Sequence, residues 1–262
     1  MLAQRLITAA VGIPLVALVV WVGGALLAGV VALAAFIAVV EFAIARASGR
    51  KPLALLAALA AAAPPLASLA GEDYVLGAVV AGVVVLASAF VLSSDPGRDA
   101  QDLVWGVSTS LYFGFLASYL VLLREGDNGR DLLFFTILTV WITDTGAYFV
   151  GRSIGRHKLA PVISPGKTIE GSAGSLVTGF IAVFVLNEVF GLGLALEHRV
   201  ALGLMLPAVI MLGDLAESAL KRSLSLKDSS GLVPGHGGVA DRLDSLLFAG
   251  PAVYYYLKWI VL

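Results

Sequence analysis

The sequence contains no cysteine, so it has no disulfide bond, no thiolate nucleophile and no cysteine-ligated metal. It is also poor in charge: Asp, Glu, Lys and Arg make up 13% of its 262 residues, against about 25% in a typical soluble domain. Its longest hydrophilic stretch, Lys221 to Asp244, is too short to fold alone. No soluble domain is therefore visible in the sequence, and we expect no nucleic-acid partner.

Apolar residues are abundant instead. They make up 59% of the chain, and the mean hydropathy is +0.96. A membrane-spanning helix needs roughly 20 mainly apolar residues, whereas barrel strands are shorter and alternate. The long continuous runs therefore predict an all-α, polytopic integral membrane protein with about nine transmembrane helices. The expected spans are Leu6–Val22, Ala25–Ala45, Leu53–Ala70, Tyr74–Leu92, Leu103–Leu123, Leu132–Val150, Gly171–Phe190, Val200–Leu220 and Ser245–Leu262.

The basic residues are distributed unevenly between the two sides of this arrangement. With nine spans, thirteen of the 17 Lys and Arg residues fall on the side of the N-terminus and four on the other. Basic residues collect on the cytoplasmic side of membrane proteins. We therefore expect an inner-membrane protein with its N-terminus in the cytoplasm.

The first half of the chain, residues 1–130, holds about five spans and little chemistry. Glu41 is the one acidic residue inside these spans, and we interpret it as a solvated or paired group rather than a functional site. Pro64 and Pro65 interrupt the third span, so a single re-entrant unit in place of the third and fourth spans is an alternative.

The second half, residues 131–262, is expected to form the catalytic region, with cytoplasmic loops at 152–170 and 221–244. Asp144 lies inside the sixth span, and ionisable groups at such depth are functional candidates. The eighth span places one set of polar residues on a single helix face, because their spacing is i, i+3, i+4 and i+7. These residues are Asp214, Glu217, Ser218 and Lys221.

The loop that follows combines cations, carboxylates and glycines. Glycines let backbone N–H groups approach an anion, Lys and Arg bind phosphate oxygens, and Asp suits Mg²⁺. This mixture at a membrane surface favours a metal–polyphosphate site facing the cytoplasm. Its members are Lys221, Arg222, Lys227, Asp228, His236, Gly237, Gly238, Asp241, Arg242 and Asp244.

The other loop contains Gly166-Lys167-Thr168, which is the end of a P-loop motif. The full motif needs a glycine where this chain has Pro161, and it needs a preceding strand where this chain has a membrane helix. A P-loop nucleotide hydrolase is therefore excluded. Lys167 and Thr168 are still expected to bind phosphate at the start of the seventh span, where free N–H groups favour anions.

These motifs carry a resemblance to a known family. Ser218-x-x-Lys221-Arg222, Lys227-Asp228 and His236-Gly237-Gly238-x-x-Asp241-Arg242-x-Asp244 resemble the signature of the phosphatidate cytidylyltransferases (CDP-diacylglycerol synthases). A second block of that family is similar to Asp144, Ala147-Tyr148, Gly151-Arg152, Lys158-Leu159 and "ISPGKTIEG". The resemblance covers about residues 141–250.

The resemblance implies transfer of CMP from CTP to phosphatidic acid, giving CDP-diacylglycerol and pyrophosphate for phospholipid biosynthesis. It also implies Mg²⁺, a monovalent cation such as K⁺, and a homodimer. Asp214 and Asp241 would hold the metal, with Asp144 and Asp244 as additional ligands or as partners of the ligands. Other polar residues of this region would bind the phosphates of the substrates or donate hydrogen bonds to them. These are Lys158, Ser164, Lys167, Thr168, Ser218, Lys221, Arg222, Lys227, Arg242 and the Gly237–Gly238 backbone.

Two other functions are compatible with intramembrane carboxylates. A lipid kinase that uses CTP would transfer the γ-phosphate rather than the cytidylyl group. An ion-coupled transporter would place polar residues through the bilayer midplane and on both sides, whereas here they crowd one face. The nucleotidyltransferase is the preferred interpretation.

Overall fold

The structure is a computed structural model that describes residues 2–46, 51–92, 100–232, 235 and 237–261. Within these residues the chain is almost entirely helical, with one two-stranded hairpin. Seven helical segments of the described residues are long and apolar enough to cross a membrane. The all-α polytopic class is therefore confirmed, whereas the number of nine spans stays a prediction.

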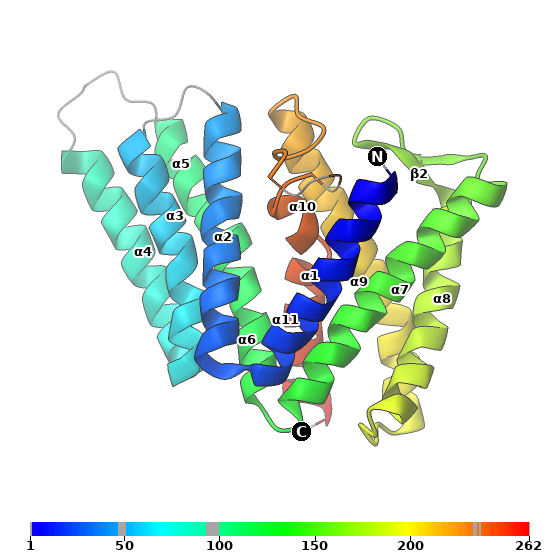
Figure 1. Cartoon of the computed structure of the whole chain (residues 1–262). Helices are drawn as coiled ribbons and strands as arrows, with labels where there is room; N and C mark the ends of the chain where they lie inside the picture. Colours follow the sequence, from blue (N-terminus) through cyan, green and yellow to red (C-terminus); the bar gives the residue numbers. More distant parts are fainter. Residues whose placement is uncertain (1, 47–50, 93–99, 233–234, 236, 262) are drawn as a thin grey trace. The chain divides into compact units, whose positions relative to one another are not determined.

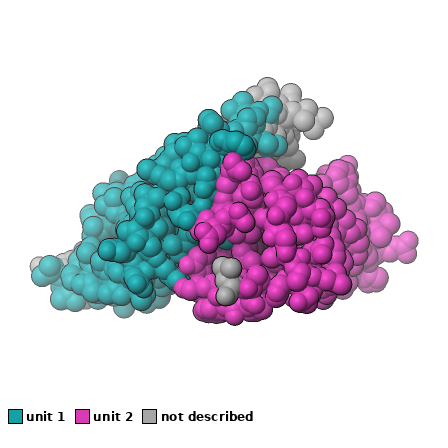
Figure 2. Space-filling model, turned by 90° about the horizontal axis from the view of Figure 1, so that it is seen from below, with its two compact units in different colours: residues 1–125, 228–243 teal, residues 126–227, 244–262 magenta. Residues whose placement is uncertain are grey.

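The chain divides into two compact units, coloured separately in Figure 2. Unit 1 comprises residues 1–125 and 228–243, and unit 2 comprises residues 126–227 and 244–262. The division near residue 126 is close to the boundary at 130 expected from the sequence. The units differ from that expectation in one respect, because residues 228–243 of the second motif loop belong to unit 1.

Unit 1 is built from helices that pack through small side chains. Helices α2, α3 and α4 run side by side (Figure 1). Alanines of α2 and α3, among them Ala35, Ala38, Ala57 and Ala61, are fully buried, and such residues let membrane helices approach closely. The bounds of its elements are α1 (Leu2–Val22), α2 (Gly24–Arg46), α3 (Lys51–Ala67), η1 (Ser68–Ala70), α4 (Glu72–Leu92), α5 (Ala100–Thr109), η2 (Ser110–Phe115), α6 (Leu116–Glu125) and α10 (Ala240–Leu243).

The third and fourth expected spans are two separate helices, each long and apolar enough to cross a membrane, which favours two spans over a re-entrant unit. Pro64 and Pro65 lie inside α3, and the Ser68 hydroxyl donates a hydrogen bond to the Pro64 carbonyl at 3.0 Å. The chain reverses at Gly71, whose φ of +116° suits glycine, and α4 then begins at Glu72. Only Val75 and Leu86 of α4 are buried, so its other apolar side chains are available to lipid.

Unit 2 contains two closely packed helices joined by the hairpin. Glycines make the approach of α7 and α8 possible: a Cβ at Gly171 would lie 3.2 Å from the Gly151 Cα and 2.9 Å from the Ala147 carbonyl oxygen. The antiparallel strands therefore lie at the end of this helix pair. The bounds are α7 (Gly129–Ile154), β1 (Lys158–Ala160), β2 (Ser164–Thr168), α8 (Ile169–Val189), α9 (Leu196–Ser223), α11 (Leu246–Tyr256) and η3 (Leu257–Val261).

Both expected loops are partly regular. The first, 152–170, consists of the end of α7, the hairpin and the start of α8. In the second, 221–244, α9 continues to Ser223 and α10 occupies Ala240–Leu243. The hairpin was not expected, because its short strands lie in a polar, proline-containing stretch without alternating hydrophobicity.

Candidate active site

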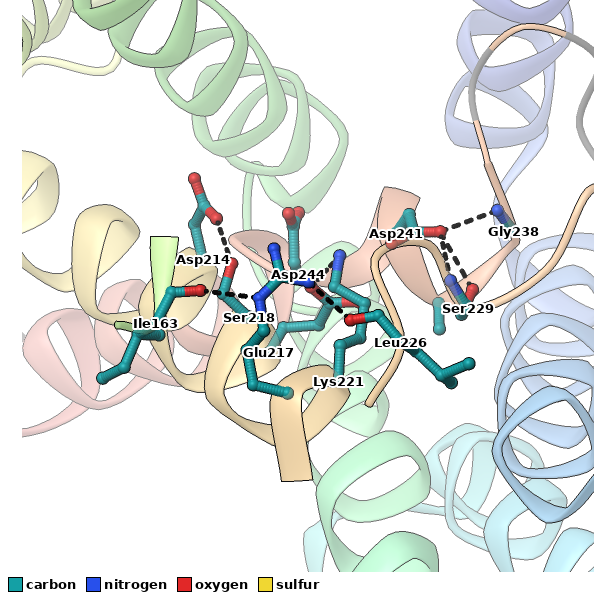
Figure 3. A network of polar contacts seen from close by, with 12 residues as sticks. Ile163, Asp214, Glu217, Ser218, Lys221, Leu226, Ser229, Gly238, Asp241 and Asp244 are labelled. Atoms are coloured by element: carbon teal, nitrogen blue, oxygen red, sulfur yellow. Dashed lines mark hydrogen bonds and ion pairs between the residues drawn. The ribbon is translucent and has the colours of Figure 1, made fainter. Parts of the chain in front are cut away.

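The hairpin of unit 2 places a lysine against the eighth expected span. Lys167 on β2 directs its Nζ to within 2.5 Å of Asp214 Oδ2 on α9. The Asp214 side chain is 30% exposed, and its Oδ1 lies 3.4 Å from the Ser218 hydroxyl one turn further along (Figure 3). The predicted metal ligand Asp214 is thus brought together with two predicted phosphate-binding residues, Lys167 and Ser218.

Thr168 has a structural contact at the same place. Its hydroxyl accepts a hydrogen bond from the Gly171 N–H at 3.1 Å and so caps the N-terminus of α8. The side chain is buried, and a Cβ at Gly155 would lie 2.7 Å from its Oγ1. Lys167 and Thr168 therefore stand immediately before α8, as expected, and the cap fixes the backbone from which Lys167 projects.

A second ion pair lies one turn further along α9. Glu217 is fully buried, and its Oε2 lies 2.7 Å from Lys221 Nζ. Removing a carboxylate from water costs free energy that a close cation offsets. The pair fixes the direction of the Lys221 side chain, which is 13% exposed. The expected one-face arrangement of α9 is thus present, with Glu217 as its buried member.

Arg222 connects α9 to both neighbouring loops. Its Nε donates to the Ile163 carbonyl at 3.1 Å and its Nη1 to the Leu226 carbonyl at 2.6 Å (Figure 3). An arginine carries five N–H donors, so these bonds leave others for a ligand. The exposed guanidinium thus joins the turn of the β1–β2 hairpin to the end of α9.

Asp244 belongs to the same unit. The backbone before α11 comes close to α9, because a Cβ at Gly213 would lie 3.0 Å from the Asp244 carbonyl oxygen. The Asp244 carboxylate accepts a bond from the Ser245 N–H at 2.7 Å. In Figure 3 the carboxylates of Asp214 and Asp244 point toward the same side.

The third predicted carboxylate, Asp241, lies in unit 1 and has a different setting. Its Oδ2 accepts hydrogen bonds from the Gly238 N–H at 2.8 Å and from the N–H and hydroxyl of Ser229 at 3.0 Å each (Figure 3). Asp241 is only 7% exposed. N–H and O–H donors of Ser229 and Gly238 thus meet at one carboxylate oxygen of Asp241.

The Gly237–Gly238 pair is required by these close contacts. Gly237 has φ of +83°, and a Cβ there would lie 2.5 Å from Asp241 Oδ2. A Cβ at Gly238 would overlap the Ser229 hydroxyl and lie 2.5 Å from Glu41 Oε2. The glycines were predicted to bring N–H groups to a phosphate; here the Gly238 N–H serves Asp241.

Glu41 has a role that the sequence did not predict. It lies on α2, is 3% exposed, and its carboxylate accepts four hydrogen bonds, from the hydroxyls of Ser229 and Ser230 and from the N–H groups of Val239 and Ala240. It is neither solvated nor held by a cation among the described residues. The one available signal was an acidic residue in an otherwise apolar span.

The remaining predicted residues are dispersed over both units. In unit 2, Lys158 on β1, Lys227 after α9 and Asp144 on α7 are exposed, and Ser164 on β2 is half-buried. In unit 1, Asp228 and Arg242 are exposed. His236 lies outside the described residues. Among the described residues, no group of three His, Asp or Glu side chains is arranged to hold a metal ion. Mg²⁺ sites need fewer, because this ion keeps waters or substrate phosphates as ligands.

The fold and the α9 cluster define a polytopic membrane protein with lysines and carboxylates at the end of one helix. The sequence profile of the cytidylyltransferase family matches residues 3–260, so the chain belongs to that family. The chain is 42% identical to the phosphatidate cytidylyltransferase of Bacillus subtilis over 56% of this chain and 55% of the relative. It is 38% identical to the Staphylococcus saprophyticus phosphatidate cytidylyltransferase over 69% of this chain and 68% of the relative.

The match to some relatives thus spans about half of their length. A more complete match is to the phosphatidate cytidylyltransferase of Synechocystis sp., which is 33% identical over 97% of this chain and 96% of the relative.

Proposed function

We propose that this chain is a membrane-bound nucleotidyltransferase that transfers CMP from CTP to phosphatidic acid, yielding CDP-diacylglycerol and pyrophosphate. Membership of the cytidylyltransferase family and the names of its relatives support this reaction. The structural observation that carries the proposal is the cluster on α9, where Lys167 meets Asp214 and Lys221 meets Glu217. Such cations suit a polyphosphate, and carboxylates beside them suit the metal that accompanies it.

In the proposed reaction, a phosphate oxygen of phosphatidic acid attacks the α-phosphorus of CTP. The bond from that phosphorus to the bridging oxygen of the β-phosphate breaks, and pyrophosphate leaves. Because the nucleophile is already an anion, the protein needs no strong base; positioning and charge neutralisation are its main contributions. Lys167, Lys221 and Arg222 would orient the phosphates from the end of α9 and the hairpin.

Two carboxylates of unit 2 support the proposal of a magnesium ion. Asp214 is part-exposed and Asp244 points to the same side, and carboxylate oxygens are the ligands that Mg²⁺ prefers. We propose these two residues as its ligands in unit 2. The ion would neutralise charge on the transferring phosphate. The roles of Asp241 and Asp144 as ligands, the monovalent cation, the homodimer and the cytoplasmic orientation stay predictions from the sequence.

The position of the label in the product tests the reaction. Purified protein is incubated with phosphatidic acid, Mg²⁺ and CTP labelled either at the α- or at the γ-phosphate, and the lipid is then extracted. We expect α-label in the lipid and γ-label in aqueous pyrophosphate. Transfer of γ-label to the lipid without α-label would instead identify a CTP-dependent lipid kinase.

A further inference from the structure

The buried carboxylate of Glu41 connects the chemically plain first half of the chain to the second motif loop. Its four donors lie 188–199 residues away in sequence, in the segment Ser229–Ala240. This segment carries the Gly237–Gly238 pair and ends one residue before Asp241. The first half of the chain therefore supplies more than a membrane anchor.

Both oxygens of the Glu41 carboxylate accept two hydrogen bonds. Glu41 Oε1 accepts from the Ser230 hydroxyl at 2.5 Å and the Val239 N–H at 2.9 Å. Glu41 Oε2 accepts from the Ser229 hydroxyl at 2.9 Å and the Ala240 N–H at 3.0 Å. Each oxygen thus holds one bond to each end of the segment. A carboxylate accepts such bonds more strongly than a neutral group does.

The contacts of Glu41 and Asp241 share one side chain. The Ser229 hydroxyl lies 2.9 Å from Glu41 Oε2 and 3.0 Å from Asp241 Oδ2. A hydroxyl has one hydrogen, so it donates to one of these oxygens at a time. The backbone N–H groups of Ser229 and Gly238 also donate to Asp241, and the neighbouring Val239 and Ala240 N–H groups donate to Glu41.

We infer that Glu41 is a positioning residue for the proposed cytidylyl transfer, acting on Asp241 and Gly238 through its bonds to Ser229, Ser230, Val239 and Ala240. Its burial supports this role, because a carboxylate that is 3% exposed forms bonds that water does not replace. The inference rests on the proposed function only for its effect on turnover. The attachment of the segment to Glu41 is independent of any reaction.

The test compares Glu41→Gln, Glu41→Ala and Ser230→Ala with the unchanged protein in lipid nanodiscs. Glutamine keeps one acceptor oxygen and so two of the four bonds, alanine keeps none, and Ser230→Ala removes one. Glu125→Gln is the matched control, because Glu125 is an exposed glutamate of the same unit that accepts a bond from the Gly24 N–H.

Two quantities are measured for each variant: amide hydrogen exchange of a peptide covering 228–243, and the kcat and KM for CTP per folded molecule. We expect exchange in this peptide to accelerate about tenfold or more in Glu41→Gln, further in Glu41→Ala and less in Ser230→Ala. Exchange in peptides of α9 should not change. The kcat should fall in the same order, by roughly tenfold to a hundredfold for Glu41→Gln, with a smaller change in KM.

A merely structural role gives a different pattern. It would lower the amount of folded protein and leave kcat per folded molecule at the level of Glu125→Gln, and that result overturns the inference. Unchanged exchange at 228–243 in Glu41→Gln overturns it as well. If both Glu41 variants fail to fold, Ser230→Ala decides by the same criteria. If the unchanged protein transfers no cytidylyl group, the proposed function fails, while the exchange data still decide whether Glu41 holds the segment.

Discussion

Asp241 and Asp214 are both predicted metal ligands, but their hydrogen-bonding environments differ. In unit 1, Asp241 is 7% exposed, and the Gly238 and Ser229 donors to its Oδ2 are neutral. In unit 2, the Asp214 side chain is 30% exposed and pairs with the ammonium group of Lys167. Ser229 and Gly238 donate hydrogen bonds to Asp241, whereas Asp214 pairs with a long cationic side chain.

The two environments have different physical consequences. Neutral N–H and O–H donors fix the direction of a carboxylate without adding positive charge, so Asp241 keeps its orientation. A lysine neutralises a carboxylate but can also move, because its stem has four rotatable bonds. If a metal binds Asp214, as we propose, the mobile Lys167 side chain would be released to bind a phosphate. We expect substitution of the glycines beside Asp241 to disturb geometry, and substitution of Lys167 or of the Asp241 carboxylate to disturb charge.

The substitution Asp241→Asn should have the largest effect. The asparagine oxygen can still accept the bonds from Ser229 and Gly238, so the loop should remain folded. If Asp241 binds the metal, loss of its charge should lower kcat/KM by at least about a hundredfold. The loss of kcat/KM is measured as cytidylyl transfer by the purified variant. Hydrogen exchange of residues 228–243 serves as the folding control. Near-normal turnover would show that Asp241 only organises the loop.

Gly238→Ala should disturb the same loop through packing. The added Cβ would overlap the Ser229 hydroxyl and lie 2.5–2.6 Å from the Glu41 carboxylate oxygens. We expect a loss of about 1–3 kcal/mol in stability and roughly a tenfold to hundredfold loss of turnover. Gly231→Ala is the matched control in the same loop, because its Cβ meets nothing within 4 Å. Equal thermal stability and turnover of the two variants would contradict the close packing of Gly238.

Much of the fold could be predicted from local sequence. The spans agree with the helices to within a few residues, because long apolar runs ended by charged or Gly- and Pro-rich stretches mark them directly. The helix face of Asp214, Glu217, Ser218 and Lys221 followed from spacing alone. Both kinds of feature depend on residues close together in the chain.

What could not be predicted depends on distant residues. Glu41 contacts a loop 188 residues away, and nothing near position 41 indicates that partner. Two other contacts can also be identified only in the folded chain. One is the bond from the Gly238 N–H, which goes to Asp241 and not to a substrate, and the other is the ion pair between Lys167 and Asp214. The sequence shows which side chains can accept or donate hydrogen bonds, but tertiary packing determines which partners they meet.

Lys167→Met should have a smaller effect and would sharpen the contrast with Asp241. It removes a cation that meets both Asp214 and, as proposed, a phosphate, so kcat/KM for CTP should fall about tenfold to a hundredfold. The Mg²⁺ concentration for half-maximal activity should also fall, because the lysine no longer competes with the metal for Asp214. Lys167→Arg, which keeps the charge, is the control and should retain more activity.

A rise in the Mg²⁺ requirement of Lys167→Met would contradict this competition. It would mean that Lys167 and the metal support each other, for instance by binding different oxygens of one phosphate. Asp214 would then be held as firmly as Asp241, and the contrast between the two carboxylates would disappear.

Ser218→Ala should have the smallest effect. The Ser218 hydroxyl lies 3.4 Å from Asp214 Oδ1, which is beyond the usual length of a hydrogen bond between oxygens, so little orientation of Asp214 is lost with it. We expect kcat/KM for CTP to change less than about threefold, since neutral hydrogen bonds contribute little and this one is long. Steady-state kinetics with CTP and phosphatidic acid varied separately would measure it. A loss of tenfold or more in one KM would show that Ser218 bonds that substrate directly. Binding of that substrate in unit 2 would then depend on a neutral hydroxyl donor as well as on charged side chains.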